Sequence, residues 1–284
     1  MKKLISLILT LALLSLTAVA FAEGAAIPAP EGTDTKITIG VTAVPHGEIV
    51  NDVVKAKLEA AGWTVDVVEF TDYVLPNTSL EDGELDANYF QTIRYMDEEN
   101  LQRGLHLVAV AGIHLEPMGL YSQKFTSLED IPDGASIAVP NDGSNESRAL
   151  KLLADNGLIE LESTDGLYTV QSISGNPHNY EIVELNAENL TRNLPDVDAA
   201  VINGNYALQA DLNPATDALT AERADSDESY LYINYLVVTE GNEETIKTQA
   251  LVAALVNADV RDYIEENYSG SVIPAFELPE EAAE

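Results

Sequence analysis

The 284-residue sequence contains no cysteine. Disulfide bonds, thiolate metal sites and a cysteine nucleophile are therefore excluded. Basic residues are also scarce: 14 lysines and arginines stand against 48 acidic residues, giving a formal net charge of −34. A surface this acidic repels nucleic acids and anionic membranes, so we expect no nucleic-acid partner. Because such charge keeps a protein dispersed, we predict a monomer.

The sequence also lacks the short motifs of common hydrolases and nucleotide enzymes. It has no G-x-S-x-G, no H-E-x-x-H and no phosphate-cradling loop. We therefore predict that the protein is not an enzyme and uses no cofactor. An enzyme built on paired carboxylates stays open, because nothing selects one pair among 48 acids.

The chain begins with the pattern of a secretory signal peptide. Two lysines precede an apolar run at 4–19, and Ala20, Phe21 and Ala22 form a cleavage site of small residues. We predict cleavage after Ala22, with a transmembrane anchor as the alternative. The mature protein would be periplasmic or on the cell surface. Without a cysteine, we predict that it is not lipidated through that residue.

Apolar segments of strand length alternate with helical patterns along the chain. This alternation is typical of parallel or mixed sheets with helices on both faces, so we predict an α/β fold. The acidic end at 277–284 is predicted to be a tail. The strand segments are 36–44, 63–70, 106–113, 135–140, 180–185 and 198–203.

One arginine is placed where a carboxylate could bind. Arg148 follows a strand and a loop rich in Gly, Asn and Ser, near the start of a helix. Ser144 or Asn145 could cap that helix and leave free backbone N–H groups beside the guanidinium. A guanidinium grips a carboxylate with two hydrogen bonds. The alternative is an ion pair between Arg148 and one of the many acids.

Two asparagines stand in or next to apolar strands. Asn203 ends the strand segment at 198–203, where open α/β sheets bind ligands, and its amide can both donate and accept. Asn234 interrupts an apolar strand at 231–239, where a buried amide must be satisfied. Each asparagine could instead make a purely structural hydrogen bond.

A metal site is a further alternative. His114 and Glu116 alternate on one strand face and could both ligate zinc, but two ligands do not make a site. The remaining histidines are scattered along the sequence, and His46 is expected to fix a strand-to-helix turn.

Six sequence blocks, in one order over roughly residues 36–275, resemble the methionine-binding lipoproteins of bacterial ABC importers, the NlpA-type family. Any single block would be a weak signal, whereas six in one order are specific. The blocks are VPHGEIV (Val44–Val50), DYVLPNTSLEDGELDANYFQ (Asp72–Gln91), HLEPMGLYS (His114–Ser122), AVPNDGSNESRAL (Ala138–Leu150), AVINGNYA (Ala200–Ala207) and INYLVVTE (Ile233–Glu240).

The resemblance implies a two-lobe periplasmic-binding-protein fold of type II with the ligand cleft between the lobes. One lobe would comprise 34–118 with 236–276, and the other 119–235. The implied function is an extracytoplasmic substrate-binding protein that delivers an amino acid to an ABC permease and its ATPase. Methionine, L or D, is the expected ligand. Another amino acid, a short peptide or a metal bound by His114 and Glu116 are the alternatives.

The resemblance also implies roles for individual residues. An aromatic slot would hold the ligand side chain, one arginine would bind its carboxylate, and two asparagines would contact it. In place of a histidine common in the family, this chain has Thr92, which changes the size and polarity of the pocket wall. Glu116 is expected to face the ligand ammonium. The implied set is Tyr73, Phe90 and Tyr95 for the slot, Arg148 with Asn145 and Tyr206 for the carboxylate, and Asn203 and Asn234 as the asparagines.

Overall fold

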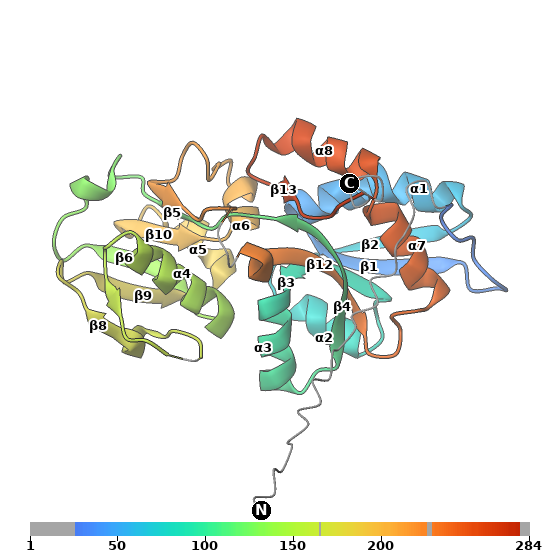
Figure 1. Ribbon diagram of the computed structural model, residues 1–284, viewed down its shortest axis with the longest axis horizontal. Coiled ribbons are helices and arrows are strands. Elements are labelled where there is room, and N and C mark those ends of the chain that lie inside the picture. The colour runs from blue at the N-terminus through green and yellow to red at the C-terminus, as the bar shows by residue number, and fades with distance from the viewer. Residues whose placement is uncertain (1–25, 165, 226–228, 279–284) are drawn as a thin grey trace, which may run out of the picture.

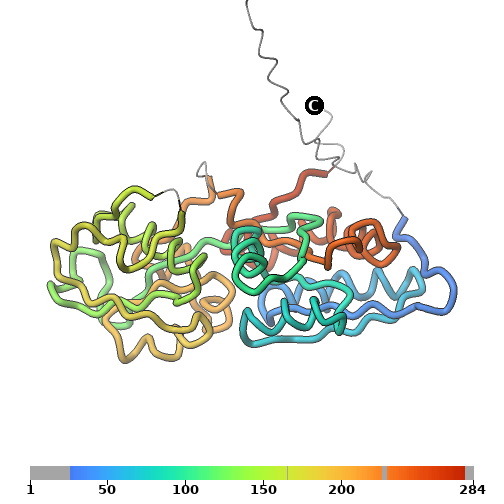
Figure 2. Tube along the Cα trace, turned by 90° about the horizontal axis from the view of Figure 1, so that it is seen from below, coloured from blue at the N-terminus to red at the C-terminus, as the bar shows by residue number. Residues whose placement is uncertain are grey.

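The structure is a computed structural model that describes residues 26–164, 166–225 and 229–278. The predicted signal peptide at 1–22 and most of the predicted acidic tail lie outside these residues. Two sheets, each with its own helices, lie side by side and form two lobes (Figures 1 and 2). This arrangement confirms the predicted two-lobe α/β fold.

The first lobe is built on a six-stranded mixed sheet. Strands β1, β2 and β3 run parallel, whereas β12 pairs antiparallel with both β3 and β4. A strand from the C-terminal part of the chain thus lies in the middle of the sheet, between two strands from the N-terminal part (Figure 1). In sheet order the strands are β13 (Ile273–Pro274), β4 (Leu107–Leu115), β12 (Ile233–Thr239), β3 (Ala87–Thr92), β1 (Lys36–Thr42) and β2 (Thr64–Phe70).

The second lobe is built on a five-stranded mixed sheet. Strand β6 pairs in parallel with β9 and β10, and β5 pairs antiparallel with β10 and β11. A two-stranded ribbon of β7 (Glu160–Leu161) and β8 (Ile173–Gly175) is separate from this sheet. In sheet order the strands are β11 (Thr220–Ala221), β5 (Gly119–Tyr121), β10 (Ala199–Ile202), β6 (Ser136–Pro140) and β9 (Glu181–Leu185).

Helices cover both faces of each sheet, as the alternating pattern predicts. In the first lobe, α1, α7 and α8 bury one apolar face of the sheet, and α2 and α3 bury the other. In the second lobe, α4 covers one face and α5 and α6 cover the other. The helices are α1 (Lys55–Ala60), α2 (Leu75–Glu81), α3 (Ile93–Arg103), α4 (Gly143–Asp155), α5 (Leu190–Asn193), α6 (Gly204–Gln209), α7 (Ile246–Leu255) and α8 (Ala258–Tyr268).

The alternation of side chains along the strands explains the apolar core of the first lobe. Ile37, Ile39 and Val41 of β1 are fully buried against Leu58 of α1 and Leu251 of α7. Burying side chains of this size contributes roughly 1.5–3 kcal/mol each. None of the described helices is both long and apolar enough to cross a bilayer.

The chain passes between the sheets twice. It leaves the six-stranded sheet after Leu115 and enters the five-stranded sheet at Gly119. It leaves the five-stranded sheet after Ala221 and returns at Ile233. The lobe boundaries at 118/119 and 235/236 stay a prediction.

Candidate functional site

A small pocket lies between the two lobes, and nine of the ten predicted ligand-binding residues line it. Its free volume is about 20 Å³, room for about one water molecule. An amino acid can therefore enter only when the lobes move apart. The nine residues are Tyr73, Phe90, Thr92, Tyr95, Glu116, Asn145, Arg148, Asn203 and Asn234, joined by Gln91, Gly204 and Asn205, which the sequence did not indicate.

Aromatic rings form one wall of the pocket. The Tyr73 ring centroid lies 5.8 Å from that of Phe90 and 5.6 Å from that of Tyr95. These spacings are those of interacting aromatic pairs, so the three rings form one packed surface. On its other side Tyr73 packs at 4.9 Å against Tyr206 of the second lobe.

Tyr206 is the predicted residue that does not line the pocket. Its hydroxyl donates to the backbone oxygen of Thr71 at 3.1 Å, from the second lobe to the first. Tyr206 thus contacts the outer side of the aromatic wall, and burial raises its pKa so that the hydroxyl stays protonated.

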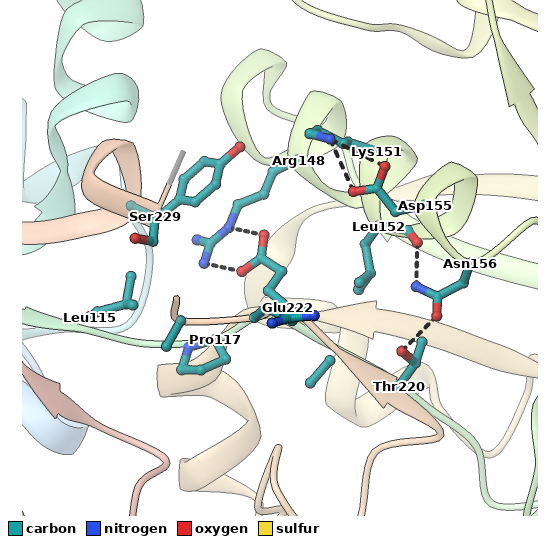
Figure 3. A pocket seen from close by; sticks show the side chains of 14 residues that line it. Leu115, Pro117, Arg148, Lys151, Leu152, Asp155, Asn156, Thr220, Glu222 and Ser229 are labelled. Carbon is teal, nitrogen blue, oxygen red and sulfur yellow. Dashed lines mark hydrogen bonds and ion pairs between the residues drawn. The ribbon is translucent and has the colours of Figure 1, made fainter. Parts of the chain in front are cut away.

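Arg148 reaches the pocket from α4 but is paired with a carboxylate. Its Nε and Nη2 donate to Glu222 at 2.7 and 2.6 Å, as Figure 3 shows. Nη2 also donates to the backbone oxygen of Glu116 at 2.8 Å, and the guanidinium lies 4.2 Å from the ring centroid of Tyr232. The ion pair that the sequence left open therefore exists, and it fixes the position of the guanidinium.

The cavity on the far side of Arg148 has a volume of about 470 Å³ (Figure 3). Its other charged groups are partnered as well: Lys151 contacts Asp155, and Arg223 contacts Asp225. Among the described residues that line this cavity, no charged group is left unpaired to select a ligand.

Two buried amides that line the pocket each carry an unsatisfied atom. Among the described residues, Asn203 Oδ1 and Asn205 Nδ2 have no hydrogen-bond partner. Asn203 Nδ2 donates to Asn145 Oδ1 at 2.8 Å, and Asn205 Oδ1 accepts from Tyr73 at 2.6 Å. A buried polar atom without a partner is costly, so one acceptor and one donor are poised for a ligand.

Asn145 is not free to contact a ligand through its amide nitrogen. Its Nδ2 donates to both carboxylate oxygens of Asp142, at 2.9 and 3.0 Å. Asp142 also caps α4 by accepting from the backbone nitrogen of Asn145 at 2.9 Å. The expected cap, Ser144 or Asn145, is therefore wrong, because the helix begins earlier, at Gly143.

Glu116 lies at the centre of a buried network. His114 Nε2 lies 2.7 Å and His46 Nε2 3.3 Å from its Oε1, and the backbone nitrogen of Asn205 donates to the same carboxylate. Burial lowers the pKa of His46 to about 4 and that of His114 to about 3, and it raises the pKa of Glu116. Both imidazoles are therefore neutral at neutral pH.

The structure adds His46 to the two possible metal ligands, His114 and Glu116, that the sequence indicated. His46, His114 and Glu116 place their ligand atoms within 4.8 Å of one another. Each ring nitrogen, however, already has a partner: His46 Nδ1 lies 2.8 Å from Thr42 Oγ1, and His114 Nδ1 meets the hydroxyl of Tyr89. The cluster is thus complete as a hydrogen-bonded network.

Thr92 and Asn234 lie opposite each other in the paired strands β3 and β12. Thr92 caps α3 by accepting from the backbone nitrogen of Tyr95 at 3.2 Å. Asn234 Oδ1 lies 3.1 Å from His46 Nε2, which is the structural hydrogen bond that the sequence left open. Both residues still line the pocket.

The residues missed by sequence reasoning stand beside residues that it named. Asn205 is two positions after Asn203, and Glu222 lies far along the chain from Arg148. Gln91 follows Phe90, and its amide is fully engaged with Asn77 and Asn88. The only sequence signal for Asn205 was the AVINGNYA block, in which two asparagines precede a tyrosine.

The two lobes and the polar and aromatic pocket between them define a substrate-binding protein of the periplasmic type. The model of one family, described as NlpA lipoprotein, matches residues 37–276. The chain belongs to the NlpA lipoprotein family. This result confirms the resemblance carried by the six sequence blocks.

Individual relatives agree with the family assignment. Membrane lipoprotein TpN32 of Treponema pallidum is 38% identical over 245 residues, covering 86% of this chain and 90% of the relative. Methionine-binding lipoprotein MetQ of Bacillus subtilis is 37% identical over 253 residues, covering 87% and 90%. A nutrient-binding protein from Burkholderia cenocepacia, solved bound to methionine, has a TM-score of 0.79 at 43% identity, covering 84% of this chain and all of that one.

These relatives overturn one prediction. From the absence of cysteine we expected a protein not lipidated through that residue, but the family and its relatives are named lipoproteins, a class lipidated at an N-terminal cysteine. That expectation is corrected.

Proposed function

We propose that the protein is the amino-acid-binding component of an ABC importer and that its ligand is methionine. The observation that carries the proposal is the pair of unsatisfied atoms in the pocket, the acceptor Asn203 Oδ1 and the donor Asn205 Nδ2. A free amino acid has an ammonium group that donates and a carboxylate that accepts, so it satisfies both atoms.

The two charged groups that line the pocket match the two charged ends of a free amino acid. The guanidinium of Arg148, held in place by Glu222, supplies positive potential for the ligand carboxylate. The carboxylate of Glu116, which accepts from the backbone nitrogen of Asn205, supplies negative potential for the ammonium group. Both groups line the same pocket. Asn145 and Asn234 act by holding Asn203 and His46 in place.

The aromatic wall supports an apolar ligand side chain. Tyr73, Phe90 and Tyr95 present ring surface to the pocket, and a thioether makes favourable contacts with aromatic rings. Thr92 at the edge of this wall is where specificity among apolar amino acids would be set. The methionine named for the relatives fits such a wall.

In this proposal the protein binds its ligand without converting it. The lobes close on the amino acid, and the closed form, as a monomer, docks on the membrane permease that an ATPase drives. A ligand that contacts both lobes shifts the equilibrium toward the closed form.

The test is calorimetric titration of protein that has been unfolded, stripped of ligand and refolded. We expect saturable binding of methionine, with L- and D-methionine, the other amino acids, methionine dipeptides and zinc as comparisons. If only a different amino acid binds, the proposed transport role stands and the proposed specificity for methionine is wrong. An absence of heat with every amino acid and peptide, from protein with a native circular-dichroism spectrum, would reject the proposal.

A further inference from the structure

Asp142 lies outside the pocket between the lobes but is joined to it by two hydrogen-bonded amides, those of Asn145 and Asn203. It stands at the start of α4, where its Oδ1 accepts from the backbone nitrogen of Asn145 at 2.9 Å. The side-chain nitrogen of the same asparagine lies 2.9 and 3.0 Å from the two carboxylate oxygens. Asp142 therefore engages both the backbone and the side chain of Asn145.

A carboxylate determines which way a neighbouring amide points. Both side-chain oxygens of Asp142 accept from Asn145, so the amide nitrogen of Asn145 is turned toward Asp142, although burial raises the pKa of this carboxyl group. Its oxygen is then turned toward Asn203, 2.8 Å from Asn203 Nδ2. That oxygen in turn requires a donor, so the nitrogen of Asn203 is held away from the pocket.

The end of this chain of contacts is an acceptor aimed at the ligand. With its nitrogen committed, Asn203 presents Oδ1 to the pocket, where the oxygen is buried and has no partner among the described residues. Without the carboxylate at Asp142, both amides could rotate by 180° and keep their mutual hydrogen bond. Asn203 would then present a donor instead.

We propose that Asp142 is a positioning residue that makes the pocket select ligands carrying a hydrogen-bond donor, the α-ammonium group, at Asn203. This inference rests on the proposed function and deepens it, because it names the residue that sets the polarity of the site. Asp142 acts only through Asn145 and Asn203 and does not touch the ligand.

The experiment compares methionine with 4-(methylsulfanyl)butanoate, which is methionine without its amino group. Asp142→Asn retains a good helix cap, so the fold is kept, but a carboxamide can offer either a donor or an acceptor to Asn145. In the variant we expect the preference for methionine over the amino-free acid to fall roughly tenfold, the effect of one mismatched buried hydrogen bond.

The matched control is Asp198→Asn. Asp198 also accepts from a backbone nitrogen, that of Ser136 at 2.9 Å, and it stands at the opposite end of β10 from Asn203. The same chemical change there should leave the preference unaltered. If Asp142→Asn melts at a much lower temperature than the wild type, Asp142→Ser replaces it, because serine also caps the helix and can donate or accept.

A double-mutant cycle with Asn203→Ala separates positioning from a structural role. If Asp142 acts through Asn203, Asp142→Asn has no further effect on the preference in the Asn203→Ala background. A preference that stays within twofold of wild type in Asp142→Asn overturns the inference and leaves the proposed function intact. If the wild type binds no amino acid, the proposed function fails and the inference falls with it.

Discussion

The hydroxyl of Tyr73 donates a 2.6 Å hydrogen bond to the side-chain oxygen of Asn205, and this bond joins the two lobes. Tyr73 belongs to the segment between β2 and α2, and Asn205 belongs to α6 of the second lobe. Burial raises the pKa of Tyr73, so the phenol remains a donor at any physiological pH. The closed arrangement of the lobes therefore depends in part on a bond between two residues of the pocket itself.

Tyr73→Phe should weaken methionine binding by roughly three- to tenfold, because the closed form loses one hydrogen bond worth about 1 kcal/mol. Titration calorimetry measures the change, and small-angle scattering should detect a more open ligand-free protein. Tyr263→Phe is the control: it removes a 2.6 Å hydrogen bond to Asp52 within the first lobe. Equal losses of affinity in the two variants would contradict a role of Tyr73 in closure.

The Arg148–Glu222 pair predicts that stability and binding can be separated. Arg148→Met should lower the free energy of unfolding by about 3 kcal/mol, because it leaves a largely buried carboxylate unpaired. Adding Glu222→Gln should restore most of that stability without restoring methionine binding. Urea denaturation and calorimetry measure the two quantities. Recovery of binding in the double variant would show that Arg148 does not contact the ligand.

The close packing around Gly204 leaves no room for a larger residue at the contact between the lobes. A Cβ at this position would lie 2.7 Å from Glu116 Cβ and 3.3 Å from the backbone oxygen of Pro117. Gly204→Ala should therefore cost about 1–3 kcal/mol and weaken ligand binding.

Gly143→Ala, in the first turn of α4, is the control for that variant, because its nearest neighbours are side-chain atoms at 3.4 Å. Thermal denaturation and titration of both variants measure the effect. A Gly204→Ala protein as stable as Gly143→Ala would show that α6 can move away from Glu116.

The buried histidines predict that stability falls in acid. The pKa of His46 is lowered by burial to about 4 and that of His114 to about 3, against 6.5 for an unperturbed histidine. Between pH 6.5 and 4 the unfolded chain therefore binds more protons at these rings than the folded protein does. The free energy of unfolding should decrease as the pH falls through this range, by up to about 1.4 kcal/mol per pH unit for each ring.

Urea denaturation at several pH values between 7 and 4.5 measures this slope. Glu116 acts in the opposite direction, because its pKa is raised by burial and the folded protein takes up its proton at a higher pH. His46→Gln should make the slope shallower. A slope that is the same in the wild type and the variant would mean that His46 is accessible to protons in the folded state.

The sequence predicted the strands well where apolar residues run continuously. The segments at 63–70, 135–140 and 180–185 correspond to β2, β6 and β9 within one residue at either end. Strand β3 was not predicted as a strand, since half of its residues are polar. Its buried Asn88 and Gln91 are satisfied by Asn77 of α2, a partner that only the folded chain brings close.

The sequence by itself determined the family, the two-lobe fold and most of the pocket lining. These properties follow from local patterns and from blocks whose residues stand close together along the chain. The tertiary structure alone decided how the polar groups are paired. Arg148 meets Glu222 74 residues away, and His46 meets Asn234 188 residues away.

The polarity of the site was likewise decided only in three dimensions. An asparagine in a sequence can present either its oxygen or its nitrogen, and Asn203 is oriented by contacts that run through Asn145 to Asp142, about 60 residues before it. Burial then makes each unmatched atom costly, so the pocket acquires a defined acceptor and a defined donor. Composition and spacing carry no information on such orientation, because it depends on which groups meet when the lobes close.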